Sequence, residues 1–258
     1  MNSEMDLMFW QIVSAYLFIL LLLLIVKVKG IRREKEIMIS TIRMTLQLIL
    51  VGYLLIYIFE NPSPFVTVLI FAIMLSFATL NVFRRTKMEI TRSLKKSIII
   101  AMIFGITSSL LYFIFIVLTL APWYDPQFFI PIAGMIIGNS MTGITLGVNH
   151  LLNGMQTQKD QVEAALILGA TPKLATNKVI NQAFDAALLP TINSMVGMGI
   201  VFLPGMMTGQ ILSGVSPLVA VNYQIAIMLG IVGSVSLSVI TFLQLGYKNF
   251  FNERSQLK

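Results

Sequence analysis

The chain has 258 residues, of which 57% are hydrophobic and only 11% are charged, and its mean hydropathy is +0.86. A soluble domain carries about 25% charged residues, so a soluble fold of this composition would expose large apolar patches. The absence of cysteine excludes disulfides, thiolate metal ligands, iron–sulfur clusters and cysteine nucleophiles.

Seven apolar segments follow one another along the chain, each long enough for a membrane-spanning helix, which needs about 20 residues. Their expected bounds are 7–26, 37–59, 65–83, 97–121, 128–148, 186–212 and 218–245. In lipid only a helix satisfies its own backbone hydrogen bonds without closing into a barrel, and these runs lack the alternation of membrane strands. We therefore predict an all-α polytopic membrane protein with about seven transmembrane helices in a single transmembrane domain, residues 1–258.

The basic residues predict how these segments are oriented. All of the 18 Lys and Arg residues except Arg43 lie in alternate loops or the C-terminal tail, whereas the opposite side carries the acids Glu4, Asp6, Glu60 and Asp125. The positive-inside rule then places the N-terminus outside and the C-terminus in the cytoplasm. This pattern explains the net charge of +7, so we expect contacts with membrane lipid and no nucleic-acid partner. A cleaved signal peptide is the alternative for the first segment, but its flanking charges have the wrong order.

The longest loop, residues 150–185, follows the fifth segment and is expected in the cytoplasm. Residues 158–171 favour a helix that ends at Gly169, and Pro172 cannot easily continue it. One side of this short helix is apolar and suited to docking; it carries Val162, Ala165, Leu166 and Gly169.

The sequence Glu163-Ala164-Ala165, followed by Gly169, resembles the EAA-x-x-x-G loop of ABC-transporter permeases. In that family the loop forms the coupling helix, which sits in a cleft of the ATPase subunit. Leu189-Pro190 lies further beyond the glycine than in the importer version, and a simple interfacial helix is the alternative.

Longer stretches resemble the FetB-type metal-export permeases, a family that includes bacterial iron exporters and plant aluminium-tolerance proteins. The similar stretches, in order within residues 40–250, are 131–141 (PIAGMIIGNSM), 168–173 (LGATPK), 187–191 (ALLPT), 203–209 (LPGMMTG) and 213–225. Where many members carry an acid and a lysine after the Pro-Thr pair, this chain has Asn193 and Val196, which leaves the identity of the metal open.

The resemblance implies a permease subunit in the inner or plasma membrane that exports metal ions, most readily iron, as a homodimer with a separate ATPase. The chain has no G-x-x-x-x-G-K-[ST] phosphate loop, so we expect it to bind no cofactor and the partner to hold ATP and Mg. The residues implied to couple to the ATPase are Glu163, Ala164, Ala165, Gly169, Ala170, Thr171 and Pro172.

Polar and helix-breaking residues within the spans are candidates for a translocation path, because polar groups are costly in lipid. They are Arg43, Gln47, Asn139, Ser140, Asn193, Pro204 and Gly205. A helix broken at Pro204 would free backbone carbonyls for an ion. The alternatives are snorkelling of Arg43, hydrogen bonds between helices, and an inert kink. Three G-x-x-x-G pairs predict close helix packing; they begin at Gly134, Gly143 and Gly205.

The chain contains 16 methionines, whose thioethers favour soft cations. The candidates for metal contacts in the fifth and sixth segments are Met135, Met141, Met195, Met198, Met206 and Met207. Methionine is also ordinary filler in apolar cores, and the single histidine, His150, makes a poor metal site.

Three other functions stay open at this stage. A permease of this kind could carry a lipid or another non-metal solute. A membrane scaffold would not need the EAA-like helix. An intramembrane enzyme is disfavoured because the chain lacks H-E-x-x-H and cysteine, and its one histidine has no acid in the same span.

Overall fold

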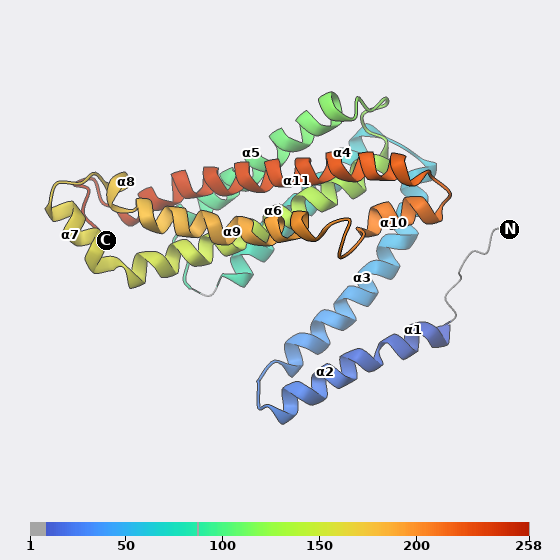
Figure 1. The fold of residues 1–258 in the computed structure, drawn as a ribbon, viewed down its shortest axis with the longest axis horizontal. Helices are drawn as coiled ribbons and strands as arrows, with labels where there is room; N and C mark the ends of the chain where they lie inside the picture. Colours follow the sequence, from blue (N-terminus) through green and yellow to red (C-terminus); the bar gives the residue numbers. More distant parts are fainter. Residues whose placement is uncertain (1–8, 87, 258) are drawn as a thin grey trace. The chain divides into compact units, whose positions relative to one another are not determined.

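The computed structural model describes residues 9–86 and 88–257, and the elements in this part of the chain are helical (Figure 1). They are α1 (Phe9–Ala15), α2 (Leu17–Val28), α3 (Glu34–Glu60), α4 (Pro64–Arg85), α5 (Arg92–Tyr112), the π-helical turn η1 (Phe113–Val117), α6 (Pro126–Thr157), α7 (Lys159–Ile167), α8 (Pro172–Ala175), α9 (Asn177–Gly197), α10 (Gly205–Leu212), α11 (Pro217–Gly246) and the 3-10 turn η2 (Tyr247–Phe250). The all-α prediction is confirmed. The start of the first span and the predicted charges Glu4, Asp6, Lys87 and Lys258 lie outside the described residues.

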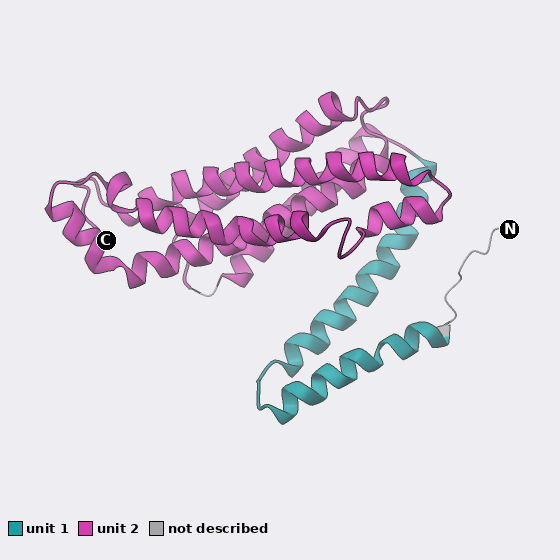
Figure 2. Cartoon of the chain, in the orientation of Figure 1, with its two compact units in different colours: residues 1–61 teal, residues 62–258 magenta. Residues whose placement is uncertain are grey.

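The described part of the chain divides into two compact units (Figure 2). Unit 1, residues 1–61, contains α1, α2 and α3. Inside it the Tyr16 hydroxyl and the Thr45 hydroxyl are 2.5 Å apart, which joins the first helical hairpin across its two arms. Unit 2, residues 62–258, contains all the remaining helices.

Six helical stretches among the described residues are long and apolar enough to cross a membrane. They are Trp10–Val28, Glu34–Glu60, Pro64–Arg85, Arg92–Val117, Pro126–Thr157 and Pro217–Phe250. The predicted segment 186–212 is instead interrupted: α9 ends at Gly197 and α10 begins at Gly205. Within unit 2, α9 and α10 follow one another alongside α11 (Figure 1), so together they extend about as far as one span.

Prolines mark the start of several helices. Pro64, Pro126, Pro172 and Pro217 each occupy the first helical position, where a missing backbone N–H costs nothing and the fixed φ favours the helix. The Asp125 carboxylate caps α6 by accepting a hydrogen bond from the Gln127 N–H at 3.0 Å. These caps place the helix starts one or two residues before the apolar runs that predicted them.

The core of unit 2 is built around α6 and α11, with α4, α5 and α9 packed against them. Its fully buried side chains include Ile144 and Val148 of α6 and Val235 and Val239 of α11. Glycine lets the helices approach: a Cβ added at Gly143 would lie 2.7 Å from a methyl of Val235. The other predicted glycine pairs contribute less, since a Cβ at Gly138, Gly205 or Gly209 would meet nothing within 4 Å.

One end of unit 2 gathers most of the predicted cytoplasmic groups. The start of α5 meets the turn η2 that follows α11 there: the Asn249 Nδ2 donates a hydrogen bond to the Ser97 hydroxyl at 3.0 Å. The Lys95 ammonium lies 5.9 Å from the centre of the Phe83 ring near the end of α4. The helices α7 and α8 and the C-terminus lie together at one end of the unit in Figure 1.

Candidate functional site

The predicted coupling helix is α7, which is shorter than the expected 158–171. Helix α6 continues to Thr157 and α9 begins at Asn177, so the connection between them is residues 158–176 rather than 150–185. Val162 anchors α7 in the core with 1% of its surface exposed. Glu163 is half-buried and its carboxylate lies 3.6 Å from the Lys159 ammonium. Since both side chains are about half exposed, this ion pair stabilises the helix little.

Gly169 ends α7 in the way that the sequence predicts. Its φ is +89°, a conformation that glycine adopts without strain. The Gly169 N–H donates to the Leu166 carbonyl and the Ala170 N–H to the Ala165 carbonyl, both at 3.0 Å. This pair of bonds is the Schellman arrangement at a helix C-terminus.

The chain then reverses through Thr171 and Pro172 into the short helix α8. The Thr171 hydroxyl caps α8 by accepting a hydrogen bond from the Leu174 N–H at 3.4 Å. The predicted coupling residues Glu163, Ala164, Ala165, Gly169, Ala170, Thr171 and Pro172 therefore form one continuous surface element.

The tip of this element presents large apolar side chains. Ile167 and Leu168 are 85% and 87% exposed. A cavity of about 540 Å³ lies beside them, between α7 and the C-terminal tail, and is lined by Glu163, Leu166, Ile167, Ala170, Arg254, Ser255, Gln256 and Leu257. An exposed apolar tip at the end of a membrane protein is suited to a protein partner.

Within unit 2, the polar residues predicted for the path are not brought together. Arg43 and Gln47 are exposed on α3 in unit 1. Asn139 is exposed on α6 and donates its side-chain N–H to the Met135 carbonyl of the same helix at 2.8 Å. Ser140 is fully buried, and its hydroxyl bonds the Ser234 hydroxyl of α11. Ser140 therefore joins helices rather than lining an open path.

The interruption in the sixth predicted segment is larger than Pro204 alone would cause. We call residues 198–204 the α9–α10 break. The helical geometry ends at Gly197, since Met198 is extended. Gly199 follows with a φ of +85°, and Pro204 directly precedes the first residue of α10, Gly205. Asn193 is exposed on α9, one turn before the break.

The candidate methionines lie around the α9–α10 break and along α6. Met198 begins the break, and Met206 and Met207 lie in the first turn of α10. Met207 is buried, and the partly buried members that pack against the core are Met135, Met141, Met198 and Met206. Met195 is 40% exposed.

One residue next to these methionines was not predicted. Gln224 of α11 is only 6% exposed, and its side-chain N–H lies 3.8 Å from the Met198 sulfur. Its side-chain oxygen has no hydrogen-bond partner within the described residues. The signal that the sequence offered was an amide side chain inside the apolar run 217–246, which also contains Asn222 and Gln244.

A profile of the uncharacterised protein family UPF0014 matches residues 9–251. The chain belongs to the UPF0014 family. Its relatives include the probable iron export permease protein FetB of Escherichia coli, 36% identical over 94% of this chain and 92% of the relative. The UPF0014 membrane protein YjkA of Bacillus subtilis is 34% identical over 94% of this chain and 95% of its own length.

The UPF0014 relatives extend to plants. The protein ALUMINUM SENSITIVE 3 of Arabidopsis thaliana is 33% identical over 95% of this chain and 88% of the relative. No solved structure matches the chain. These relatives and the six apolar spans identify a multi-pass protein of the membrane-permease class, a transporter rather than an enzyme. They confirm the resemblance drawn from the sequence.

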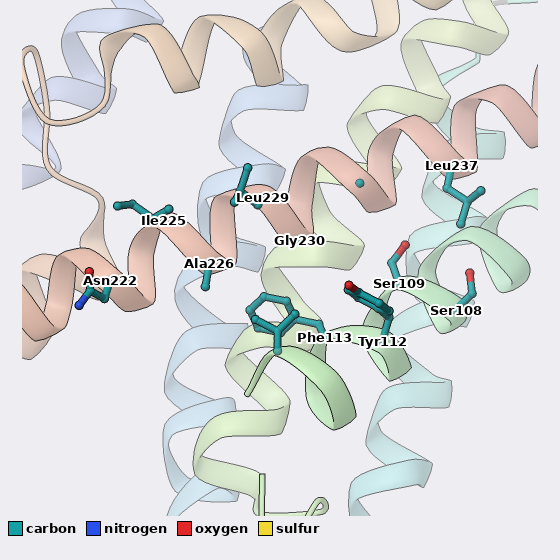
Figure 3. Close-up of a pocket in the computed structure, with 12 residues that line it drawn as sticks. Ser108, Ser109, Tyr112, Phe113, Asn222, Ile225, Ala226, Leu229, Gly230 and Leu237 are labelled. Atoms are coloured by element: carbon teal, nitrogen blue, oxygen red, sulfur yellow. The ribbon is translucent and has the colours of Figure 1, made fainter. Parts of the chain in front are cut away.

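A groove of about 790 Å³ lies between α5 with η1 and α11 (Figure 3). Its walls are mainly apolar, and the polar side chains at its edge are Ser108, Ser109, Tyr112 and Asn222. None of the residues predicted for the path lines it. The groove suits an apolar chain better than an ion.

Proposed function

We propose that this protein is the transmembrane permease subunit of an ABC transporter that exports metal ions, most readily iron, from the cytoplasm. It works as a homodimer, and a separate ATPase subunit binds ATP and Mg and supplies the energy. The proposal extends to this chain what the name of its Escherichia coli relative says of that protein.

The observation that carries the proposal is the form of α7. Its Val162 side fixes the helix to the core, and its other end exposes Ile167 and Leu168. A short helix held this firmly transmits a push from a docked partner to α6 and α9, between which it lies in sequence. The bond between the Gln158 and Gln182 side chains, 2.8 Å long, links the two helices at that point.

The proposed orientation has α7 and the C-terminus in the cytoplasm and the N-terminus outside. The basic residues near the ends of α4, α5 and α11 support it, because cytoplasmic loops carry an excess of Lys and Arg. In this orientation the broken pair α9 and α10 crosses the membrane as the sixth of seven spans, before α11. A periplasmic position for α7 would contradict the proposal.

The deciding experiment is transport into inside-out vesicles that contain this chain and its ATPase. We expect ATP-dependent accumulation of iron, with copper, manganese and zinc as competitors that rank the cargo. Glu163→Arg is expected to abolish accumulation while ATP hydrolysis continues, because the reversed charge disturbs the docked face of α7.

A matched control is Glu60→Arg, the same change at the end of α3, which the proposed orientation places outside. It should leave transport intact. Normal transport by Glu163→Arg would remove the coupling role of α7. Hydrolysis without accumulation of any metal would remove metal as the cargo.

The groove beside α5 favours one alternative, a permease for a lipid or another apolar solute. Its volume of about 790 Å³ falls in the range of small-molecule sites, about 300–1,000 Å³. Uptake of a fluorescent phospholipid by the same vesicles, without metal accumulation, would favour this alternative.

A further inference from the structure

The α9–α10 break leaves backbone carbonyl groups without partners. Among the described residues, the carbonyl oxygens of Ile200, Val201 and Leu203 accept no backbone hydrogen bond. The Phe202 carbonyl of the break does have a partner, because it accepts a hydrogen bond from the Gly199 N–H at 3.0 Å. Unpaired carbonyls at membrane depth are costly unless a polar ligand or water meets them.

The contact with Gln224 fixes the start of the break against α11. Gln224 is the eighth residue of α11, which begins at Pro217, so it lies about 10 Å along the helix from its start. Its side chain points to Met198, the first residue of the break, with 3.8 Å between nitrogen and sulfur.

The Gln224 amide is an expensive group at this position. It is 6% exposed, and its oxygen has no partner in the described part of the chain. Leaving a buried amide oxygen unpaired costs about 1–3 kcal/mol. A group that binds this oxygen would recover that free energy.

The break consists of apolar residues and glycine, and the ligand atoms that it offers are neutral. No Asp, Glu or His occurs anywhere in residues 186–250, and the described residues contain no group of three such side chains that would hold a metal ion. Neutral ligands cannot offset the desolvation of a highly charged ion, whose cost rises with its charge. Thioether sulfur favours soft ions over hard ones.

We propose that the Met198 sulfur, the Gln224 side-chain oxygen and the carbonyls of the α9–α10 break form a binding station for a partly dehydrated cation of low charge. Soft monovalent ions bind there most tightly, Fe²⁺ binds weakly, and Fe³⁺ and Al³⁺ are excluded. The station deepens the proposed export function and rests on it: it gives a passing ion a weak intermediate site within the span. A weak site suits transport, because the ion has to leave again.

The test is equilibrium binding to the full-length chain in detergent, with Ag⁺ as the probe. In protein labelled with ¹³C at the methionine methyl groups, Ag⁺ is expected to shift the Met198 resonance, which the Met198→Leu variant identifies. Met198→Leu and Gln224→Leu should each weaken Ag⁺ binding at this site about tenfold or more, the scale of a lost metal partner. Met155→Leu, a buried methionine of α6, should leave it unchanged. An unshifted Met198 resonance, or Ag⁺ affinity in Met198→Leu and Gln224→Leu equal to that of the parent protein, would overturn the station.

A gain of binding separates this role from a structural one. Gln224→Glu introduces a carboxylate at the same place, so Fe²⁺ should bind more tightly than in the parent protein, an outcome that misfolding cannot produce. Unchanged Fe²⁺ affinity would show that Gln224 is not a ligand. Vesicle transport distinguishes the two proposals: Ag⁺ binding without ATP-driven export of any metal removes the export function alone, and export without a Met198 shift removes the station alone.

Discussion

The Ser140 hydroxyl of α6 lies 3.0 Å from the Ser234 hydroxyl of α11, and both side chains are fully buried. Each serine satisfies the other, so neither needs water or an ion. Ser140 was a candidate for the translocation path, and its neighbour Asn139 was another. The hydrogen bond gives Ser140 a different role, which is to fix the two central helices of unit 2 against each other.

Ser140→Ala is therefore expected to lower stability slightly and leave transport intact. Hydrogen bonds between membrane helices contribute about 0.6 kcal/mol on average, and the change leaves the Ser234 hydroxyl unpaired. The free energy of unfolding in detergent should show this loss. Asn139→Ala, which removes only a bond within α6, is the control and should have the smaller effect. If Ser140→Ala lost transport while its stability stayed unchanged, the Ser140 hydroxyl would be part of the translocation path after all.

Gly105→Ala is expected to destabilise the contact between α5 and α11. An added Cβ would lie 2.6 Å from the Ser238 Cα, and backbone cannot move aside as a flexible side chain does. Overpacking of this kind costs about 1–3 kcal/mol or more. The measurement is the midpoint of thermal unfolding in detergent.

Gly138→Ala is the matched substitution. A Cβ at Gly138 would meet nothing within 4 Å, and alanine favours an α-helix over glycine by about 1 kcal/mol. The variant should therefore be as stable as the parent protein or more so. If Gly105→Ala and Gly138→Ala melted alike, the close packing at Gly105 would be wrong.

The sequence predicted much of this fold because lipid simplifies the pattern. Long apolar runs identified the spans, and Gly169 with Pro172 predicted where α7 ends, since both residues act on their own backbone. The helix ends were less accurate. Helix α6 continues through residues 149–157 and α9 begins at Asn177, because polar residues form helix outside the membrane as readily as apolar ones do inside it.

What the sequence missed depends on contacts between distant segments. Gly105 stands in no G-x-x-x-G pair, yet it allows a closer approach than any glycine of the three pairs. Whether a small residue lies at a crossing is decided by the partner helix. Gln224 was overlooked for the same reason, since its burial beside Met198 depends on how the end of α9 packs against α11. Pro204 did predict an interrupted helix, whereas the positive φ of Gly199 had no separate signal.

Gly169→Val is expected to disturb the turn after α7. A β-branched residue is strained at a φ of +89°, and left-handed geometry costs a non-glycine residue about 1–2 kcal/mol. Gly169→Asn is the control, because asparagine tolerates this conformation and a Cβ at this position would meet no atom within 4 Å. Limited proteolysis of the 158–176 connection should be faster in Gly169→Val alone. Equal cleavage of the two variants would contradict a conformational cause.

The exposed pair Ile167 and Leu168 provides a direct test of docking. If the ATPase covers them, Ile167→Ser with Leu168→Ser should weaken its association about tenfold or more, since burying one such side chain contributes about 1.5–3 kcal/mol and each 1.4 kcal/mol is tenfold. Co-purification of the two subunits at graded ATPase concentrations measures this.

The matched double variant is Leu212→Ser with Val215→Ser. Leu212 is 71% exposed and Val215 is 36% exposed. Leu212 ends α10 and Val215 lies in the connection to α11, far along the chain from α7. These two residues are expected on the outer side of the membrane, where the ATPase cannot reach them. The double variant should therefore bind the ATPase as tightly as the parent protein does. Equal weakening in both double variants would indicate a general loss of folding, and no weakening in either would place the ATPase contact elsewhere than the tip of α7.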